Sequence, residues 1–554
     1  MPIRVYNTLS NQKEAFEPVA PGKVGMYLCG PTVYKPSHIG HMVGPVIFDV
    51  IKRYLTYRGY QVTWVVNVTD VDDKLIKESA QRGISMKQLA DEMTADYMQN
   101  LEAMGVDTID HFPNATDNIA GIIDFTRGLI EQGFAYESGG DVYFEVSKDA
   151  EYGKLSNRSL DDLHGEGGEM AGRKRSPHDF ALWKSAKPGE PAWDSPWGRG
   201  RPGWHIECSV MSHAILGETF DIHGGGLDLV FPHHENEIAQ SECRHGKPQA
   251  KYWLHNGLMQ AADEAGKVGG RARERTEDMA ATGSLSASAG SRADKQPMAP
   301  DVRAQEAGKI SKSKGAGPFR ELLKTHSPEA IRLLLISTHY RSPILFSEEE
   351  IERQAARLET FYRFFKRYER VTGESFYAPG ATGSLPASAG TRADEQPVAP
   401  CTESSSSLQP PASGLLQELL AHRQAFIDKM DDDFNTAGAI ASLYESVSAL
   451  NRFVEQEKLE SGPPDAAKVA ALREGAGILR EMALVLGLFR EPPKQSATAD
   501  DQLTGRLMEL LIQLRADARK EKNFALGDKI RGGLTAIGVK LEDRAGGTEW
   551  TIEK

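Results

Sequence analysis

Residues 26–50 read MYLCGPTVYKPSHIGHMVGPVIFDV and combine a strand pattern, a loop pattern and a helix pattern. The apolar run at residues 26–28 predicts a short buried strand. Cys29-Gly30-Pro31 then indicates a loop, and Ser37 is well placed to cap a following helix with its hydroxyl. That helix is expected to continue through residues 49–55. Strand, loop and helix in this order predict one half of a nucleotide-binding, doubly wound α/β sheet.

Two histidines stand at the start of the expected helix. His38 and His41 are three residues apart, so both point to one side of the first turn. Gly40 between them has no side chain, which lets a flat ligand lie close to the backbone. The N-terminus of a helix also attracts phosphate oxygens. The pattern therefore predicts a nucleotide site, although two surface histidines on an ordinary helix would show the same spacing.

The composition indicates a soluble protein of several domains. A chain of 554 residues is too long for one core, so two to four domains are expected. The hydrophobic content is 40% without a long apolar run, and the N-terminus lacks the apolar core of a signal peptide. Four widely spread cysteines indicate a reducing compartment, so we expect a cytoplasmic protein that does not enter a membrane.

The net charge of −13 does not by itself indicate nucleic-acid binding. Binding depends on local patches, however, and residues 515–531 hold a local excess of Arg and Lys. A helix face laced with salt bridges is the simpler interpretation of that segment.

Further strand patterns continue the sheet. Residues 62–66 form a β-rich run, residues 139–146 predict a hairpin inside an inserted segment, and the sheet is expected to resume near residues 203–208. Residues 221–226 predict another strand, which ends in a glycine turn. Ligands of open α/β sheets bind at such strand ends.

Two near-identical segments, residues 281–300 and 381–400, differ at only four positions. Both are rich in Ala, Ser, Gly and Pro and offer little to bury, so we expect disordered, functionally neutral insertions. Residues 321–488 otherwise show helical spacing. The acidic run at residues 430–436 lacks the ligand spacing of a calcium loop and is expected to be a solvated helix start, capped by Asn435 or Thr436.

A metal-binding pattern lies between residues 208 and 237. His233 and Glu237 in FPHHENE are four residues apart, so they share a helix face and can hold one ion. Cys208 adds a thiolate, and Cys29, at the end of the first strand, is a candidate for the fourth ligand. This mixed donor set suits zinc, although His and Glu at this spacing also occur as a simple surface pair.

The segment Lys309-Ile310-Ser311-Lys312-Ser313 places two ammonium groups three residues apart beside small hydroxyl residues. Alone, it is typical of a solvated basic loop. Together with residues 36–41, PSHIGH, it resembles the two signatures of class I aminoacyl-tRNA synthetases. The contexts of the Cys, His and Glu residues extend the resemblance to the cysteinyl-tRNA synthetases, over about residues 2–260, 308–377 and 415–554.

This resemblance implies an α/β fold: a class I synthetase Rossmann-type catalytic domain with an inserted connective segment, followed by an α-helical bundle domain and a small C-terminal domain. The expected boundaries are 1–114 and 201–260 for the two halves of the Rossmann domain, 115–200 for the connective insertion, 261–307 and 379–413 for low-complexity insertions, 308–327 for the KISKS loop region, 328–378 and 414–492 for the tRNA-binding bundle, and 493–554 for an anticodon-binding domain.

The resemblance also implies a ligand set, namely one zinc ion per chain on Cys29, Cys208, His233 and Glu237. Zinc would make chemical sense, because an apolar pocket separates cysteine poorly from its near-isostere serine. A thiol ionises readily at zinc, whereas an alcohol does not. The substrate would have to join as a fifth ligand, since four protein ligands are usual for a structural site.

The remaining site residues follow from the same resemblance. His38, Gly40, His41, Lys309 and Lys312 are expected to bind ATP, and the two histidines and two lysines are expected to be catalytic. Trp204 is expected to wall the cysteine pocket, Thr69 to hold the amino group, and His223 and Asp228 to line the site. Mg²⁺ is expected to accompany ATP.

The implied reaction joins L-cysteine to ATP as cysteinyl-adenylate and transfers it to the 3′ end of tRNA(Cys), with the chain acting as a monomer. Two rivals remain. The ligase of the mycothiol pathway uses the same activation on an amino sugar but lacks the C-terminal helical and small domains. A non-catalytic paralogue would bind only tRNA or cysteine, and the retention of both signatures argues against it.

Overall fold

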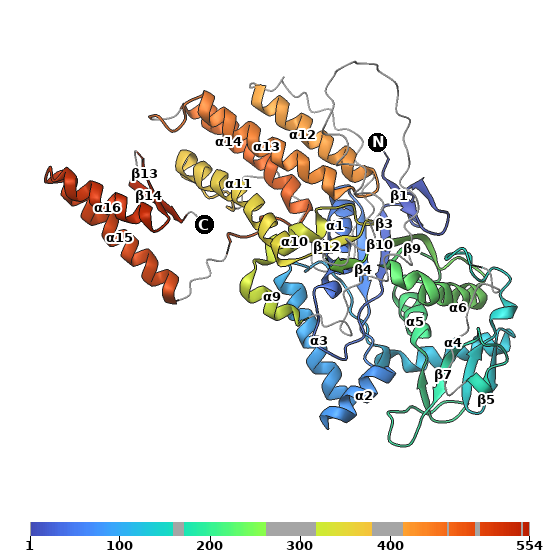
Figure 1. Ribbon diagram of the computed structural model, residues 1–554. Coiled ribbons are helices and arrows are strands. Elements are labelled where there is room, and N and C mark those ends of the chain that lie inside the picture. The colour runs from blue at the N-terminus through green and yellow to red at the C-terminus, as the bar shows by residue number, and fades with distance from the viewer. Residues whose placement is uncertain are drawn as a thin grey trace, which may run out of the picture. The chain divides into compact units, whose positions relative to one another are not determined.

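The structure is a computed structural model that describes residues 2–158, 171–261, 317–378, 414–462, 465–493, 499–544 and 547–552. The chain forms two compact units, Met1–Arg490 and Glu491–Lys554 (Figure 1). Both repeated segments, residues 281–300 and 381–400, lie outside the described residues, as do Lys309 and Lys312. Among the described helices, none is long and apolar enough to cross a membrane.

A parallel four-stranded sheet in the order β10-β9-β3-β4 lies at the centre of the first unit. Its strands are β3 (Lys23–Leu28), β4 (Gln61–Val66), β9 (Phe220–Gly226) and β10 (Ala250–Asn256). β3 leads through a helix to β4 at one edge of the sheet, whereas β9, the other central strand, leads through a helix to β10 at the opposite edge. The direction of winding therefore reverses between β3 and β9, the place where open α/β sheets bind ligands.

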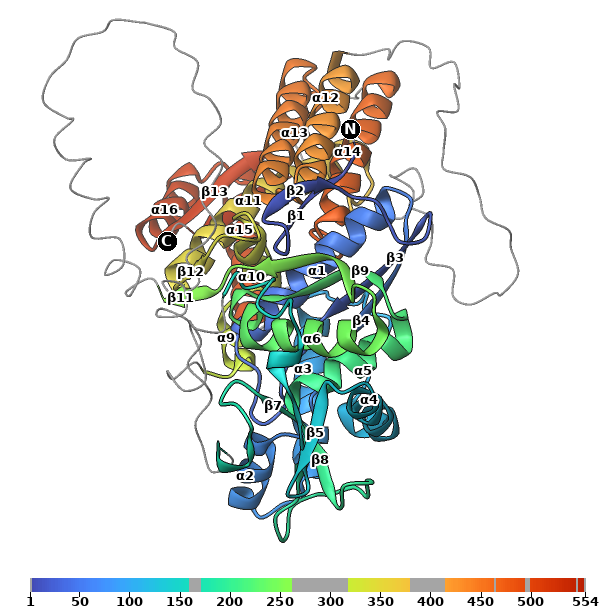
Figure 2. The ribbon, with the colours of Figure 1, turned by 90° about the vertical axis from the view of Figure 1, so that its right-hand side faces the viewer.

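Helices cover both faces of this sheet. α1 (Gly40–Tyr57) packs against all four strands, and α5 (Trp204–Leu216) packs against β3 and lies side by side with α6 (Glu235–His245) (Figure 2). The prediction that the sheet resumes at residues 203–208 is wrong, because α5 begins at Trp204. Residues 205–212 are all buried although they include His205, Glu207, Ser209 and Ser212, so the segment lacks the alternation of apolar and polar faces that identifies a helix from sequence.

Shorter elements surround the sheet. A hairpin of β1 (Arg4–Asn7) and β2 (Gln12–Ala15) packs on β10, and α2 (Asp73–Arg82) and α3 (Met86–Ala103) follow β4. Between η1 (Ala115–Asn118) and α5 lie α4 (Ile119–Glu131) and an antiparallel sheet of β5 (Ala135–Ser138), β6 (Asp141–Phe144), β7 (Phe180–Ser185) and β8 (Gly200–Pro202), with the short turns η2 (Val146–Lys148) and η4 (Ala171–Arg173). The hairpin predicted at residues 139–146 is confirmed, because β5 and β6 pair across Gly139 and Gly140.

The helical part of the first unit shares one hydrophobic core with the sheet and α1. It comprises α9 (Phe319–Thr325), α10 (Pro328–Ile336), α11 (Glu348–Thr372), α12 (Gly414–Asp431), α13 (Thr436–Gln456) and α14 (Ala466–Val485). The short strand β12 (Ile344–Phe346) pairs in parallel with β11 (Met259–Ala261), which follows β10. α12, α13 and α14 pack on one another as a bundle (Figure 1).

The acidic run between α12 and α13 is not the solvated helix start that the sequence predicts. Asn435 does cap α13, accepting a hydrogen bond from the N–H of Gly438. Asp431 and Asp433 are buried, however, and only Asp432 is exposed. A local pattern cannot reveal the basic and phenolic side chains that these carboxylates meet in distant parts of the chain.

The second unit has its own small core of Met508, Leu534, Val539 and Leu541. It consists of α15 (Ala499–Lys520), α16 (Phe524–Ala536) and an antiparallel pair, β13 (Val539–Arg544) and β14 (Gly547–Ile552). Arg515 and Arg519 both pair with Asp543. The interpretation of this basic segment as a salt-bridged helix face is therefore confirmed for these two arginines.

Candidate active site and metal centre

A cavity of about 420 Å³ opens at the carboxyl ends of β3, β9 and β10, where the winding of the sheet reverses. The loop after β3, the start of α1, α5 and the turn after β9 supply most of its lining. The lining residues are Leu28, Cys29, Gly30, Pro31, Thr32, Tyr34, His38, Gly40, His41, Val43, Gly44, Pro45, Lys74, Tyr97, Trp204, Gly225, Gly226, Asp228, Leu229, Asn256, Gly257, Leu258 and Met259. One opening thus brings together strand ends and a helix start, as the sequence predicts.

Backbone contacts hold the end of β3 in place. The N–H of Cys29 donates to the carbonyl of Gly224 in β9 (3.1 Å), and the N–H of Gly30 donates to the side chain of Asn67 (2.8 Å). A Cβ atom at position 30 would lie only 1.7 Å from the carbonyl oxygen of Asn67, so no other residue fits there. Cys29 is therefore held at the mouth of the cavity by the backbones on both sides of β3.

Four donor side chains converge beside Cys29. Cys29, Cys208, His233 and Glu237 each place one donor atom within 4.8 Å of the others. The separations are 3.8 Å between the two sulfurs, 3.5 Å from Cys29 Sγ to His233 Nε2, and 3.3 Å from Cys29 Sγ to Glu237 Oε1. His233 Nε2 lies 3.0 Å from Glu237 Oε1. The structure thus brings together all four residues of the predicted ligand set.

Cys29 directly follows β3, and the other three donors come from three further elements that the chain folds onto the end of this strand. Cys208 lies in the second turn of α5, and Glu237 lies in the first turn of α6. His233 precedes α6 in the turn η6 (Val230–His234), itself preceded by η5 (Leu227–Leu229). The helix therefore starts later than the sequence predicts, although His233 and Glu237 still face each other. A second group, Cys29, His223, His234 and Glu237, overlaps the first.

Buried partners orient the ligands from behind. His205 Nδ1 lies 2.9 Å from His233 Nδ1, so Nε2 of His233 points to the other donors. His223 Nε2 lies 2.8 Å from Glu237 Oε2, which leaves Oε1 for the group. Gln249 also donates to Glu237 Oε2 (3.5 Å). Such outer contacts fix the direction of each ligand atom.

The charges of the group are set by burial and by one another. Burial raises the pKa of the Cys29 thiol well above its usual value, whereas the hydrogen bond from Cys29 lowers the pKa of Cys208 to about 6. Burial would also raise the pKa of Glu237, but the imidazoles of His223 and His233 hold that pKa well below its usual value. The protein alone therefore presents a thiol, a thiolate and a carboxylate, and binding of a cation releases protons.

The two histidines of the start of α1 face the same cavity. The N–H of Gly40 donates to His38 Nδ1 and the N–H of His38 donates to His41 Nδ1, each over 3.1 Å. Their rings lie 3.9 Å apart. Because each Nδ1 accepts a backbone hydrogen, the proton of each neutral ring is on Nε2. Both rings therefore present an N–H donor, which suits phosphate oxygens.

The predicted cap of α1 is wrong. The helix begins at Gly40 without a side-chain cap, and Ser37 lies before it. Ser37 instead donates its backbone N–H to Asp96 and accepts the N–H of Phe319. The ring of His38 takes the N–H of Gly40, so an imidazole replaces the hydroxyl that a cap usually provides.

The four residues predicted to bind the substrate separate into two pairs. Trp204 and Asp228 line the cavity, and the ring of Trp204 stacks on His233 with centroids 4.3 Å apart. Thr69 and His223 are buried and are not among the residues that line it. Thr69 accepts a hydrogen bond from Asn67, and His223 orients Glu237. His223 thus lies behind the metal group rather than in the cavity.

Lys309 and Lys312 lie outside the described residues. Of the described chain before and after them, Met259, at the start of β11, lines the cavity. Phe319, at the start of α9, donates its N–H to Ser37, the residue before His38. Phe319 is seven positions after Lys312 in the sequence, so the two can lie at most about 25 Å apart.

Sequence reasoning missed several residues of the site. Asn256 and Gly257 line the cavity at the end of β10, and the rule that found Cys29 at a strand end would have found them too. Tyr97 reaches the cavity from the middle of α3, where no motif signals it. His205 adjoins Trp204 in the chain, but its contact with His233 depends on the packing of α5 against the turn before α6.

Known proteins resemble this chain over its whole length. Residues 15–267 match the family described as tRNA synthetases class I (C) catalytic domain, and residues 425–490 match the DALR domain. The chain is 41% identical over 552 residues to the cysteine–tRNA ligase of Thermococcus onnurineus, and the match covers 99% of each chain. It is 40% identical over 563 residues to the cysteine–tRNA ligase of Syntrophobacter fumaroxidans, with full coverage of both. The chain belongs to the cysteine–tRNA ligase family. The family assignment agrees with the predicted class I catalytic fold and helical domain.

Solved structures show the same fold at low sequence identity. Methionyl-tRNA synthetase of Mycobacterium tuberculosis bound by methionyl-adenylate aligns with a TM-score of 0.54 and 13% identity, over 84% of this chain and 91% of that one. A leucyl-tRNA synthetase from Agrobacterium radiobacter in a ternary complex aligns with a TM-score of 0.51 and 10% identity, over 85% and 84%. The chain therefore shares its fold with these methionyl- and leucyl-tRNA synthetases.

Proposed function

We propose that the chain activates L-cysteine with ATP to form cysteinyl-adenylate and pyrophosphate, and then transfers the cysteinyl group to the 3′ end of tRNA(Cys). One observation carries the proposal: a single cavity is lined by Cys29, which belongs to a sulfur-rich metal-ligand group, and by the paired imidazoles of His38 and His41 at a helix start. The relatives that share the whole chain are cysteine–tRNA ligases.

The ligand group fits zinc. With zinc bonds of about 2.3 Å to sulfur and about 2.0–2.1 Å to nitrogen and oxygen, a tetrahedron has edges of about 3.8 Å between sulfurs, about 3.5 Å between sulfur and a lighter ligand, and about 3.3 Å between lighter ligands. The donor atoms lie 3.8 Å apart for the two sulfurs, 3.5 and 3.3 Å from Cys29 Sγ to His233 and Glu237, and 3.0 Å between His233 and Glu237, each within about 0.3 Å of these edges. We therefore assign one zinc ion per chain to these residues.

Zinc would supply selectivity, since it binds and ionises the thiol of cysteine far better than the hydroxyl of serine. Cys29 faces the cavity, so the substrate would reach the ion from that side. Trp204 stacks on His233 and forms one wall of the amino-acid pocket, and Asp228 lies on the same lining. His223 acts from behind by orienting Glu237, and Thr69 supports the loop after β4 beside Asn67.

The other end of the cavity suits the nucleotide. His38 and His41 would donate from Nε2 to phosphate oxygens, and Gly40 lets ATP lie against the start of α1. Lys309 and Lys312 would neutralise the charge that develops during adenylation; the position of Met259 on the cavity lining and the bond of Phe319 to Ser37, beside His38, support this role. Mg²⁺ would accompany ATP.

The parts beyond the catalytic half favour tRNA as the acceptor over an amino sugar. The DALR match at residues 425–490 covers the end of α12 and all of α13 and α14, and the match to the relatives extends over the second unit as well. We expect the bundle to contact tRNA, the second unit to read the anticodon, and the chain to act as a monomer in the cytoplasm. The ligand group, whose Cys29 lines the same cavity as both histidines, disfavours a non-catalytic paralogue.

The test is cysteine-dependent exchange of pyrophosphate into ATP, with and without a zinc chelator, followed by charging of bulk tRNA. The proposal expects exchange with cysteine and not with serine, loss of exchange after chelation, and its return when zinc is restored. Exchange without charging, together with transfer to an amino sugar, would move the function to the rival ligase. Absence of exchange from zinc-loaded protein would contradict the proposal.

A further inference from the structure

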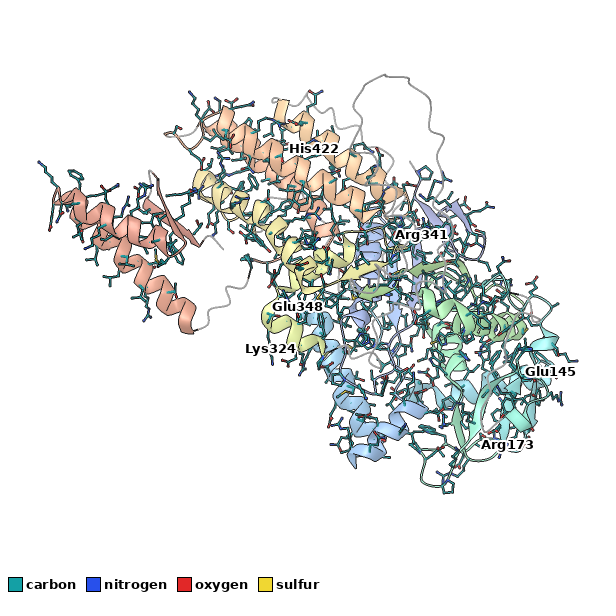
Figure 3. The ribbon with its side chains drawn as sticks, viewed as in Figure 1. Glu145, Arg173, Lys324, Arg341, Glu348 and His422 are labelled. Carbon is teal, nitrogen blue, oxygen red and sulfur yellow. The ribbon has the colours of Figure 1, made fainter. Side chains whose placement is uncertain are left out.

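The carboxylate of Asp433 joins the helical bundle to the catalytic half of the first unit. Its Oδ1 accepts the backbone N–H of Tyr6 in β1 (2.8 Å) and the hydroxyl of Tyr340 (2.9 Å). Its Oδ2 accepts Nε of Arg341 (2.9 Å). We call Asp433 with Tyr6, Tyr340 and Arg341 the Asp433 clasp. Arg341 lies near the β1–β2 hairpin and the helical bundle in Figure 3.

The backbone at the bend between α12 and α13 is shaped for this contact. Asp433 (φ 64°) and Phe434 (φ 51°) both adopt the left-handed conformation, which is costly for residues other than glycine. The N–H of Asp433 donates to the carbonyl of Arg4 over 2.8 Å, and the side chain is fully buried. Two strained residues in succession persist only where the surrounding contacts over-determine them.

The segment that the clasp holds supports the lining of the cavity. The carbonyl of Tyr340 accepts the N–H of Gly257 (2.8 Å), and the N–H of Ile344 donates to the carbonyl of Leu258 (3.1 Å). Gly257 and Leu258 both line the cavity. A Cβ atom at position 257 would lie 2.1 Å from the carbonyl oxygen of Ser342, so the two segments are in direct backbone contact.

This part of the lining adjoins the nucleotide end of the cavity. A Cβ atom on Gly44 of α1 would lie 3.6 Å from Asn256 Oδ1, so the end of β10 lies against the helix that carries His41. The chain continues from Gly257 through β11 toward Lys309. Among the described residues, those of the metal group make no hydrogen bond or ion pair with residues 339–344, and they come from the end of β3, from α5 and from the α6 region.

We propose that Asp433 is a positioning residue for the nucleotide: by binding Tyr340 and Arg341, it holds the Gly257–Leu258 lining in place for ATP. This inference rests on the proposed function. It goes beyond that function by making ATP binding depend on a residue in the helical bundle. A displacement of about 1 Å far from the reacting atoms can reduce a rate by about 10²-fold. The bond of Asp433 to Tyr340, whose carbonyl in turn binds Gly257, can therefore affect ATP although Asp433 does not line the cavity.

The test compares two neighbouring substitutions. Asp433→Asn removes the charge from the clasp at nearly constant shape. Asp432→Asn makes the same change at an exposed carboxylate that pairs only with Lys13 among the described residues (2.7 Å). In pyrophosphate exchange, Asp433→Asn is expected to raise the KM for ATP by about 10- to 100-fold, with the KM for cysteine and the zinc content unchanged. Asp432→Asn should match the wild type.

A milder variant guards against loss of folding. Tyr340→Phe removes one hydrogen bond and no charge, and it should raise the KM for ATP in the same direction by about threefold. If both clasp variants lower the melting temperature but leave the KM for ATP at the wild-type value, Asp433 is merely structural and the inference is overturned. Wild-type protein without cysteine-dependent exchange would instead contradict the proposed function, so the two failures are distinguishable.

Discussion

The two ends of the cavity are built in opposite ways. At the metal end, four ligands converge from β3, α5 and the α6 region, and buried partners orient two of them from behind. At the nucleotide end, the described residues supply two imidazoles three positions apart in one short stretch, and the lysines proposed for the site, Lys309 and Lys312, belong to a segment half the chain away. One end is thus pre-organised by packing, and the other is proposed to need a remote part of the chain.

The difference shows how the choice of the amino acid can be separated from the stabilisation of charge during phosphoryl transfer. Discrimination of a thiol from a hydroxyl needs a rigid donor set, because its selectivity comes from the chemistry of one ion. Stabilisation of the phosphoryl charge needs cations at the moment of reaction, which a separate segment can deliver. We therefore expect substitutions at the metal end to change metal content and amino-acid choice, and substitutions at the nucleotide end to change the activation rate or the KM for ATP while metal content stays the same.

The largest effect is expected for Cys208→Ser. Serine is a poor zinc ligand, so the protein should lose stoichiometric zinc and the exchange rate should fall by on the order of 10³-fold, more than outer contacts usually cost. Elemental analysis and cysteine-dependent exchange measure both. Cys243→Ser is the matched control, since the half-buried Cys243 is outside the ligand group. Full zinc content and unchanged discrimination against serine in Cys208→Ser would refute the metal end as described.

Lys312→Ala should act at the other end only. The exchange rate is expected to fall by about 10²–10³-fold, as for a lost oxyanion donor, with zinc content and cysteine affinity retained. Lys314→Ala, two residues along the same segment, removes a charge outside the signature and should have little effect. A wild-type exchange rate in Lys312→Ala would show that the nucleotide end is complete without this lysine.

His223→Asn tests the partners behind the metal group. Shortening this side chain removes the donor to Glu237 Oε2, so zinc affinity should fall by about 10- to 100-fold in competition with a chelator. His245→Asn changes an imidazole at the far end of α6 and serves as the control. Equal zinc affinities for the two variants would mean that Glu237 does not depend on its hydrogen bond to His223. The metal end would then be no more pre-organised by buried partners than the nucleotide end.

The sequence predicted those parts of the fold and site that local patterns encode. The β3–loop–α1 order, the strand ending at Gly226 and the class I family follow from short runs such as residues 26–50. Residues 203–208 were misjudged because α5 is buried on every side there, which removes the periodicity that identifies a helix.

Contacts between segments that are distant in the chain could not be predicted from the sequence alone. The burial of Asp433 depends on Tyr6 and Tyr340, which are 427 and 93 residues away from it in the sequence. The role of His223 likewise depends on Glu237 of α6, and its position on β9 alone suggested the cavity. A charged run or a lone histidine reads as exposed until its partners are known.

The smallest effect is expected for Ser37→Ala, at the start of α1. If its hydroxyl capped the helix, the substitution would cost about 1 kcal/mol of folding free energy. The imidazole of His38 accepts the N–H of Gly40 instead, so Ser37→Ala should cost less than about 0.5 kcal/mol and leave the KM for ATP unchanged.

Ser347→Ala is the matched control for this prediction, because Ser347 does cap α11 by accepting the N–H of Glu350. It should lose about 1 kcal/mol in denaturant unfolding. If the two variants lose equal stability, then Ser37 contributes to the start of α1 as the sequence pattern suggests. The helix α1 would then have an ordinary serine cap, and His38 would contribute only to catalysis and not to the start of the helix.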